Sequence, residues 1–228
     1  GVRRLRVDLP AESDCQNGFK CESIMKKRMQ KTEKNVILTG VGGQGNVLAS
    51  RALAGMLVDA GYVVTIGETF GMSQRGGSVM SHLRISPDEV KSPQIPKGRA
   101  DIVIGLEPVE ALRVLAVYGN PSTVVLSNNR PVYPIGVITG ELSYPSMEVI
   151  RAEFQRLSAS SRMIDATGAA LEMGNPVLSN VIMIGALAQT GLLPIDRKMF
   201  EKEMNKTLSA DKLAVNLKAF DAGVALMK

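Results

Sequence analysis

The stretch NVILTGVGGQGNVLASRALAGMLVDAG, residues 35–61, decides the fold of this chain. Residues 35–39 form a short apolar and β-branched run, which is typical of a buried strand. Four of the seven residues in TGVGGQG, 39–45, are glycine, so this segment predicts a turn in which a ligand or another chain comes close to the backbone. Segment 46–60 is rich in Ala and Leu and is followed by Gly61, which predicts a helix that ends at a glycine.

Further apolar runs extend this unit into a sheet. Residues 62–67, YVVTIG, predict a second buried strand, and the order strand, glycine turn, helix, strand predicts a right-handed βαβ unit. Residues 100–107 and 122–128 predict two more core strands, and residues 162–166 a short one. In 77–86, GSVMSHLRIS, apolar and polar side chains alternate, which predicts a half-exposed antiparallel strand or an edge strand.

The C-terminal half of the chain is expected to be mainly helical. Pro108 stands where the first residue of a helix would be, and that helix should close at Gly119. Segment 174–191 contains a helix so apolar that it must be buried nearly all round. Asp196 is the expected N-cap of an amphipathic helix. That helix lies within 194–208, and the segments that predict the two remaining helices are 146–157 and 212–227.

The sequence therefore predicts an α/β fold, a Rossmann-like three-layer domain with a mostly parallel sheet and a C-terminal helical layer. This domain is expected to span residues 34–228. Residues 1–33 are polar and lack a sustained period, so they are interpreted as an N-terminal arm or extension, either disordered or with a short strand at RRLRVDL. Gly1 is not a natural start, whereas Met25 or Met29 could be one.

Composition and charge exclude several classes of protein. The net charge of +5 comes mainly from residues 1–34, with nine Lys or Arg against five Asp or Glu, while the remaining residues hold 18 against 17. The folded part thus lacks the basic face of a nucleic-acid-binding protein. No stretch approaches 18 uninterrupted apolar residues, so no membrane helix is expected, and the N-terminus lacks the apolar core of a secretory signal.

The cysteine and methionine counts bear on iron–sulfur binding, on the cellular compartment and on how the core is filled. Two cysteines, Cys15 and Cys21, cannot alone supply the four thiolates of an iron–sulfur cluster, and their low number fits a reducing cytoplasm. Aromatic residues make up 4% of the chain and Trp is absent, so aliphatic residues and the 12 Met must fill the core. The methionines are interpreted as core filler, with an adaptable contact surface as the alternative.

The glycine turn matches the G-x-G-x-x-G fingerprint of dinucleotide-binding folds. Gly40 would allow the tight turn, Gly42 the close approach of a ligand or a neighbouring chain, and Gly45 close packing of helix and strand. Free N–H groups at the helix start would suit a phosphate or carboxylate. Glu68 ends the second predicted strand, where such a fold binds a ribose hydroxyl. A glycine turn can also serve only to dock another subunit. Both interpretations, binding of a nucleotide or coenzyme and docking of a subunit, stay open at this point.

A second glycine-rich segment, GETFGMSQRGGSVMSH, residues 67–82, follows the second predicted strand. It lies at the carboxyl edge of the sheet, where open α/β folds bind ligands, and Arg75 could bind a phosphate or carboxylate through two hydrogen bonds. A surface loop with a solvated arginine is the alternative. His82 is the sole histidine of the chain and has no acidic, Cys or His partner at ligand spacing, so it is expected to be a surface or interface residue.

Four segments together resemble the gamma module of the 2-oxoacid:ferredoxin oxidoreductase family. They are GVGGQGNVLASRAL, GETFGMSQRGGSVMSHLRI, GRADIVIGLEPVEALR and GNPVLSNVIMIGALA, and within the family GMSQRGGSVMSHLRI followed by LEPVEALR is most similar to the indolepyruvate branch. The resemblance covers about residues 34–228. Residues that match the two glycine segments of the family, and are therefore expected to contact a cofactor, are Gly40, Gly42, Gly43, Gln44, Gly45, Glu68, Gly71, Gln74, Arg75, Gly76 and Gly77.

The resemblance implies a complex in which this chain has no catalytic residue of its own. Such a complex oxidatively decarboxylates an aryl 2-oxoacid to an acyl-coenzyme A and passes electrons to ferredoxin. Thiamine diphosphate and [4Fe-4S] clusters would reside on a larger alpha subunit, and this chain would bind neither tightly by itself. The expected assembly is a cytoplasmic hetero-oligomer, with no nucleic acid and no membrane.

Three alternatives stay open beside this reading. The chain could be the gamma subunit of a pyruvate, 2-oxoglutarate or branched-chain oxoacid enzyme of the same family. It could be a free-standing NAD-dependent dehydrogenase, although no catalytic His or Lys beside a substrate domain is recognisable. It could also be a nucleotide-sensing module without an enzyme partner. The two glycine segments are hypothesised to line one groove that faces the alpha subunit.

Overall fold

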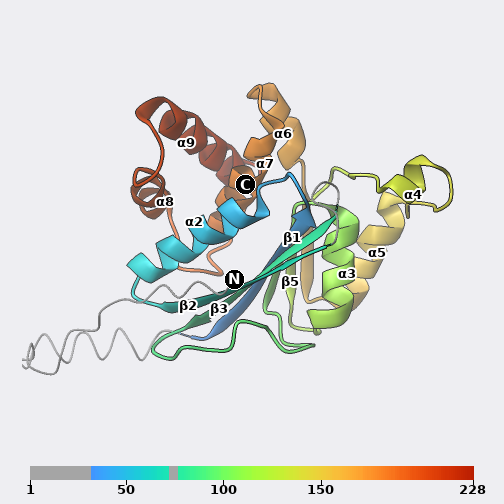
Figure 1. Ribbon diagram of the computed structural model, residues 1–228, viewed down its shortest axis with the longest axis horizontal. Helices are drawn as coiled ribbons and strands as arrows, with labels where there is room; N and C mark the ends of the chain where they lie inside the picture. Colours follow the sequence, from blue (N-terminus) through green and yellow to red (C-terminus); the bar gives the residue numbers. More distant parts are fainter. Residues whose placement is uncertain (1–31, 72–76) are drawn as a thin grey trace, which may run out of the picture.

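The computed structural model describes residues 32–71 and 77–228, which form a six-stranded sheet with helices on both faces (Figure 1). The order of the strands across the sheet is β2-β3-β1-β4-β5-β6. β1, β4, β5 and β6 pair in parallel, while β3 is antiparallel to both of its neighbours, β1 and β2. The strands are β1 Lys34–Val41, β2 Val63–Phe70, β3 Ser78–Ser86, β4 Ile102–Gly105, β5 Val124–Asn128 and β6 Ser160–Ile164.

The helices cover the two faces of the sheet unequally, and the predicted three layers and C-terminal helical layer are confirmed (Figure 1). One face is covered by α2 together with α6 to α9, and the other by α3 and α5. The helices are α2 Asn46–Asp59, α3 Pro108–Tyr118, α4 Ile135–Ile138, α5 Met147–Leu157, α6 Ala166–Glu172, the 3-10 helix η2 Pro176–Leu178, α7 Ser179–Gln189, α8 Arg197–Met204 and α9 Ala210–Ala225.

The predicted βαβ unit is present, but its two strands are not neighbours. β3 lies between β1 and β2, and Ser81 pairs with Leu38 on one side and Glu68 on the other. The antiparallel direction of β3 is confirmed, whereas its predicted half-exposure and its alternative placement at a sheet edge are wrong, because six of its nine residues are buried and none is exposed. An interior strand hydrogen-bonds along both of its sides, and β3 pairs with β2, the strand before it in the sequence, as consecutive strands commonly do.

Helix α7 is the most deeply buried helix, as its apolar sequence predicts. All residues from Ser179 to Leu187 are buried. Its backbone meets that of α9 closely, because a side chain on Gly185 would collide with the carbonyl of Phe220 and one on Gly223 with the carbonyl of Ile182. Two glycines thus let two helices touch where any larger residue would separate them.

Several local predictions are confirmed at the level of single residues. Pro108 is the first residue of α3, which closes at Gly119. The Asp196 carboxylate caps α8 by accepting from the Met199 N–H at 2.8 Å. Sequence reasoning missed the short helices α4 and α6 because both are too short for apolar residues to recur at helical spacing over several turns.

Two expectations concern residues that the structure covers only in part. The arm predicted for residues 1–33, with Cys15 and Cys21, lies outside the described residues except for its last two positions. Within 32–71 and 77–228, no helix combines the length and the apolarity needed to cross a membrane.

Candidate functional site at the carboxyl edge of the sheet

The glycine turn between β1 and α2 is filled by one of its own side chains. The Gln44 Oε1 accepts from the Val41 N–H at 2.9 Å, and its Nε2 donates to the Leu106 carbonyl at 3.0 Å. A side chain on Gly40 would collide with the Gln44 amide and would touch Asn46. The missing side chain at Gly40 therefore leaves room for the Gln44 amide that lies across the turn.

The end of the turn is held by helix α7. Asn180 Nδ2 donates to the carbonyls of Gln44 at 3.3 Å and Gly45 at 3.4 Å. Gly45 has φ +78°, and a side chain there would collide with the Asn180 amide. The predicted role of Gly45 is thus corrected, because its missing side chain makes room for α7 rather than for a strand. Gly43, at φ +101°, has open space around it.

The two glycine segments meet at the carboxyl edge, as their shared position after parallel strands predicts. The Gly42 N–H donates to the Gly77 carbonyl at 2.8 Å, and the Gly71 N–H donates to the Ser78 carbonyl at 2.7 Å. The close approach at Gly42 is therefore made by the second segment of the same chain. Of the residues expected to contact a cofactor, Gln74, Arg75 and Gly76 lie outside the described residues.

The start of helix α2 lacks a side-chain cap. Gly45 stands at the N-cap position, and no side chain accepts a hydrogen bond from the first turn. The Asn46 side chain turns back instead, with Nδ2 donating to the Val41 carbonyl at 3.2 Å and Oδ1 buried without a hydrogen-bond partner. Such a helix start suits an acceptor from outside the chain, while the donor at Gly42 is already used.

Glu68 lies within β2 rather than at its end, because the strand continues to Phe70. Its carboxylate lies 3.8 Å from the Arg51 guanidinium of α2, and the Glu68 side chain is 12% exposed. The carboxylate thus already has a cationic partner. Binding of a ribose hydroxyl by Glu68 stays a prediction.

A buried carboxylate at the end of β4 is the feature that sequence reasoning missed. Glu107 is 2% exposed, and its Oε2 accepts from the Glu110 N–H at 2.8 Å, which caps α3. Its Oε1 accepts from the Tyr144 hydroxyl and from the Val132 N–H. Burial raises the pKa of Glu107, and burial together with the neighbouring Glu107 carboxylate raises the pKa of Tyr144. An acidic residue directly before Pro108 signals the cap, but nothing local signals Tyr144.

A line of hydrogen bonds continues from the glycine turn along the edge. Asn128, at the end of β5, donates through Nδ2 to the Leu106 carbonyl at 3.1 Å and to the Thr167 hydroxyl at 2.8 Å. The Leu106 carbonyl therefore accepts from both Gln44 and Asn128. The same Asn128 accepts from the Thr167 N–H at 3.1 Å, which joins α6 to the line. Side chains from β5 and the glycine turn thus hold the edge in one arrangement.

His82 is buried, so the expectation that it lies at a surface or interface is wrong. Its Nδ1 accepts from the Ile95 N–H at 3.3 Å, its Nε2 has no hydrogen-bond partner, and its ring meets Tyr118 edge-on with centroids 5.1 Å apart. Burial lowers the pKa of His82. Its β3 position faces Ile37 and Gly67, in the middle of the sheet rather than at the carboxyl edge.

Comparison with known proteins decides the family. Residues 35–226 match the family of pyruvate ferredoxin/flavodoxin oxidoreductases. The chain belongs to this family. It is 39% identical over 197 residues to the indolepyruvate oxidoreductase subunit IorB of Pyrococcus horikoshii, a match that spans 86% of this chain and 96% of the relative. The corresponding IorB of Archaeoglobus fulgidus is 36% identical over 189 residues, 83% of this chain and 92% of the relative.

Solved structures of oxidoreductase subunits share the fold of this family member. A 2-oxoglutarate:ferredoxin oxidoreductase from Magnetococcus marinus, with 2-oxoglutarate, coenzyme A and succinyl-CoA bound, aligns with a TM-score of 0.66 at 20% identity over 87% of this chain and 31% of that chain. The gamma subunit of a keto/oxoacid ferredoxin oxidoreductase from Geobacter sulfurreducens aligns with a TM-score of 0.59 at 20% identity, over 85% of this chain and 98% of that chain. The α/β fold inferred from the sequence is thus confirmed.

The methionines of this family member lie mostly inside it. Met56 and Met183 are fully buried, and the others that the structure describes pack partly buried against the core. The core-filler interpretation fits them. Met80 belongs to this second group, and Met72 lies outside the described residues.

The side chains that the structure describes at the carboxyl edge mainly hold the edge itself together. Within residues 32–71 and 77–228, no group of three or more His, Cys, Asp or Glu side chains could hold a metal ion. The side chains at this edge are amides, hydroxyls and the capped carboxylate of Glu107. Most of their donors and acceptors are used within the chain, on backbone groups or, for Asn128 and Glu107, also on the hydroxyls of Thr167 and Tyr144.

Proposed function

We propose that this chain is a subunit of an indolepyruvate oxidoreductase. The complex oxidatively decarboxylates indolepyruvate or another aryl pyruvate to an acyl-coenzyme A and passes the electrons to ferredoxin. The observation that carries this proposal is the match to IorB of Pyrococcus horikoshii, which covers 96% of that subunit at 39% identity. A pyruvate synthase subunit PorC of Methanothermobacter thermautotrophicus matches at 33% over 69% of this chain, which favours the indolepyruvate branch.

The chemistry belongs to a larger alpha subunit in this proposal. Thiamine diphosphate, bound there, supplies the carbanion chemistry, and [4Fe-4S] clusters carry the electrons. This chain has two cysteines in total, fewer than one such cluster requires. The assembly is a hetero-oligomer in the cytoplasm, and ferredoxin is its electron acceptor.

The two glycine segments form the surface that completes the site. Their junction, the Gly42 N–H on the Gly77 carbonyl, supports the hypothesis that they line one groove facing the alpha subunit. The uncapped start of α2 and the Arg75 side chain supply the contacts to an anion, either a coenzyme A phosphate or the oxoacid carboxylate. Cofactor contact at this groove includes Gly40, Gly43, Gln44, Gly45, Glu68, Gly71, Gln74 and Gly76.

A free-standing dinucleotide-binding module fits the turn less well. In that fold the second glycine lets the backbone approach a pyrophosphate. Here the N–H of the corresponding Gly42 donates to Gly77, and Glu68 is paired with Arg51. Tight NAD binding and hydride transfer by the isolated chain would restore the dehydrogenase alternative.

The proposal is tested by anaerobic affinity purification of the chain with its complex, followed by a panel of 2-oxoacids with coenzyme A and a viologen dye as electron acceptor. The expected result is a brown complex with a larger subunit and the highest kcat/KM on indolepyruvate. The purified chain alone should show no activity. Oxidation of an oxoacid by this chain without thiamine diphosphate or metal centres would overturn the proposal.

A further inference from the structure

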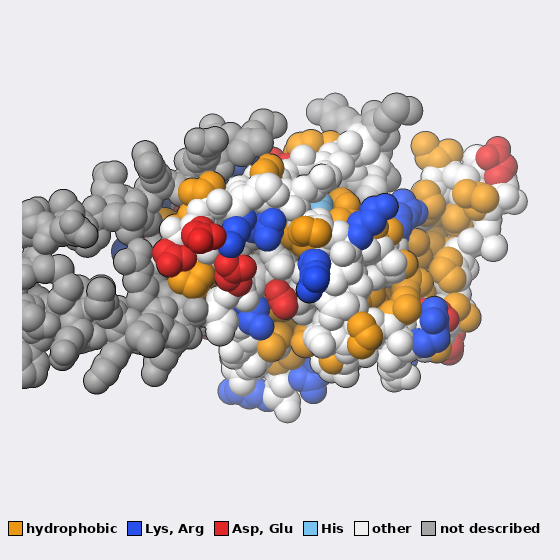
Figure 2. All heavy atoms as spheres, turned by 90° about the horizontal axis from the view of Figure 1, so that it is seen from below, with side chains coloured by type: hydrophobic (Ala, Val, Ile, Leu, Met, Phe, Trp, Pro, Cys, Tyr) orange, Lys and Arg blue, Asp and Glu red, His pale blue; other side chains and the backbone are white. Residues whose placement is uncertain are grey.

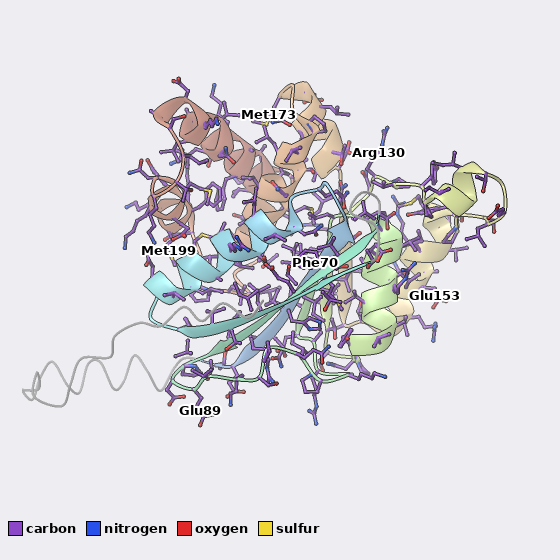
Figure 3. All side chains as sticks on the ribbon, viewed as in Figure 1. Phe70, Glu89, Arg130, Glu153, Met173 and Met199 are labelled. Atoms are coloured by element: carbon purple, nitrogen blue, oxygen red, sulfur yellow. The ribbon has the colours of Figure 1, made fainter. Side chains whose placement is uncertain are left out.

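Residues 87–99 cover part of the sheet on the side where α3 lies, and we call them the covering segment. They follow β3, and the Pro93 carbonyl lies where a side chain on Gly67 of β2 would be. Figure 1 shows the covering segment beneath β2 and β3, and Figure 3 labels Glu89 near its start. The segment has no helix or strand of its own, so its position depends on its contacts with the sheet.

The middle of the covering segment is anchored through Ile95. Of residues 87–99 only Ile95 is buried, with 2% of its surface exposed. Its N–H donates to Nδ1 of His82 in β3 at 3.3 Å. The exposed charged residues of the segment are Asp88, Glu89, Lys97 and Arg99. Figure 2, which views the molecule from below, shows acidic and basic side chains on this face. The anchor is thus one buried side chain and the histidine ring beneath it.

The His82 ring accepts this hydrogen bond only while it is neutral. Nδ1 accepts through the lone pair that a second ring proton would occupy. The proton of the neutral ring is then on Nε2, which has no hydrogen-bond partner among the described residues. The ring is fully buried and lies against Tyr118 of α3. A second proton would therefore set two N–H groups against each other and place a charge among apolar side chains.

No carboxylate of the described residues faces His82 from the elements packed against it. Directly opposed strand residues share a face, and His82 is opposite Ile37 of β1 and Gly67 of β2. The next residues on the same face of these three strands are Asn35, Thr39, Thr65, Thr69, Met80 and Arg84. The charged one among them, Arg84, is a cation, whose Nε donates to Asn35 Oδ1. Residues 92–96 carry no charge, and α3 contributes the uncharged Tyr118.

We propose that His82 is a pH-sensitive latch, which holds the covering segment through Ile95 at neutral pH and releases it when the ring takes up a proton in mildly acidic solution. Once the segment has opened, water reaches the ring and solvates the added charge. The open form therefore binds a proton that the closed form excludes, and a falling pH favours opening.

The direction of this effect follows from the surroundings of the ring. Burial lowers the pKa of His82 in the closed form below the 6.5 of an unperturbed histidine. The stabilising contribution of the neutral ring is thus complete above pH 6.5 and is lost as the pH falls below it. His82 is the sole histidine of the chain, and histidine is the side chain that ordinarily changes charge between about pH 5 and pH 8.

Hydrogen exchange of the full chain, followed by mass spectrometry from about pH 8 to about pH 5 and corrected for the intrinsic exchange rate, tests the latch. Peptides that cover residues 87–99 report opening of the segment. Peptides that cover α7 report unfolding of the whole chain, because α7 is the most deeply buried helix. The variant His82→Gln keeps an acceptor for the Ile95 N–H but does not titrate. Circular dichroism confirms that the variant is folded.

We expect exchange in the covering segment to rise at least about 10-fold at the acidic end while exchange in α7 stays unchanged, and we expect this rise to disappear in His82→Gln. The absence of a rise in residues 87–99, or an equal rise in α7, would overturn the inference. A rise that persists in His82→Gln would also overturn it. If that variant does not fold, the unchanged chain decides alone, because α7 separates local release from global unfolding.

Discussion

The glycine turn and the apolar arm, residues 132–144 with helix α4, use their side chains in opposite ways. The turn directs its polar groups inward, with Gln44 bonded to Val41 and Leu106 and with Asn180 bonded to the turn. The arm directs large apolar groups outward, with Ile135 and Ile138 largely uncovered. Substitutions in the turn should therefore change the stability of the isolated chain, whereas substitutions in the arm should change that stability little.

The largest effect on stability is expected at the turn. Gly45→Val places a β-branched residue at φ +78° and drives its side chain into Asn180, so the free energy of unfolding should fall by about 3 kcal/mol or more. Urea denaturation followed by circular dichroism measures the loss. Gly43→Ala is the control, because it has a positive φ but open space, and it should cost about 1 kcal/mol. Equal losses at the two positions would show that Asn180 does not restrict Gly45.

Glu107, which joins the arm to the sheet, should give the next largest effect. Glu107→Ala removes the cap of α3 and leaves the Tyr144 hydroxyl without its acceptor, so the free energy of unfolding should fall by about 2 kcal/mol. Urea denaturation at constant pH measures it. The control Glu153→Ala removes a half-exposed carboxylate of α5 that pairs with Arg156 near solvent, and it should cost far less. A loss no larger than that of the control would show that the buried contacts contribute little.

The raised pKa of Glu107 predicts how the stability of the folded chain changes with pH. Burial raises the pKa of Glu107 in the folded state above the 4.5 of an unperturbed glutamate. A raised pKa gives a stabilising contribution that is complete below pH 4.5 and is lost as the pH rises through the folded-state value. The stability of the unchanged chain relative to Glu107→Gln should therefore decrease as the pH rises above 4.5. An increase over that range would contradict the burial of this group.

Arg75 tests the second glycine segment in the assembled enzyme. Arg75→Ala should raise the KM for coenzyme A or for the oxoacid by about 10-fold, because a bidentate contact to an anion is lost. Steady-state kinetics of the complex measure this change, with Arg156→Ala on the exposed face of α5 as the control. Unchanged KM values for both substrates would remove the anion-binding role from Arg75.

The smallest effect is expected in the arm of the isolated chain. Ile138→Ala should change the free energy of unfolding by less than about 0.5 kcal/mol, because a side chain that is 73% exposed has little contact to lose. Urea denaturation of Ile138→Ala and of Gly45→Val under the same conditions compares the loss in the free energy of unfolding at the arm with the loss at the turn. A loss of several kcal/mol would mean that the arm packs against its own chain.

The sequence by itself determined the features that depend on neighbouring residues. Apolar runs marked the strands, Pro108 and Asp196 marked the starts of two helices, and the apolar segment within 174–191 predicted a buried helix. The glycine turn after β1 and four longer motifs were enough for the family, which the match over residues 35–226 confirms. Each of these signals lies within a short stretch of chain, where period and turn chemistry act directly.

Only the tertiary structure decided which distant residues meet. The insertion of β3 between β1 and β2 buries His82, and Asn180 of α7 holds a turn 135 residues earlier. Glu107 binds Tyr144 across 37 residues and so fixes the arm. Contacts of this kind depend on how whole elements pack, because a strand with the same alternation can lie at an edge or inside a sheet. No local pattern distinguishes these placements, so they emerge only when the chain is folded.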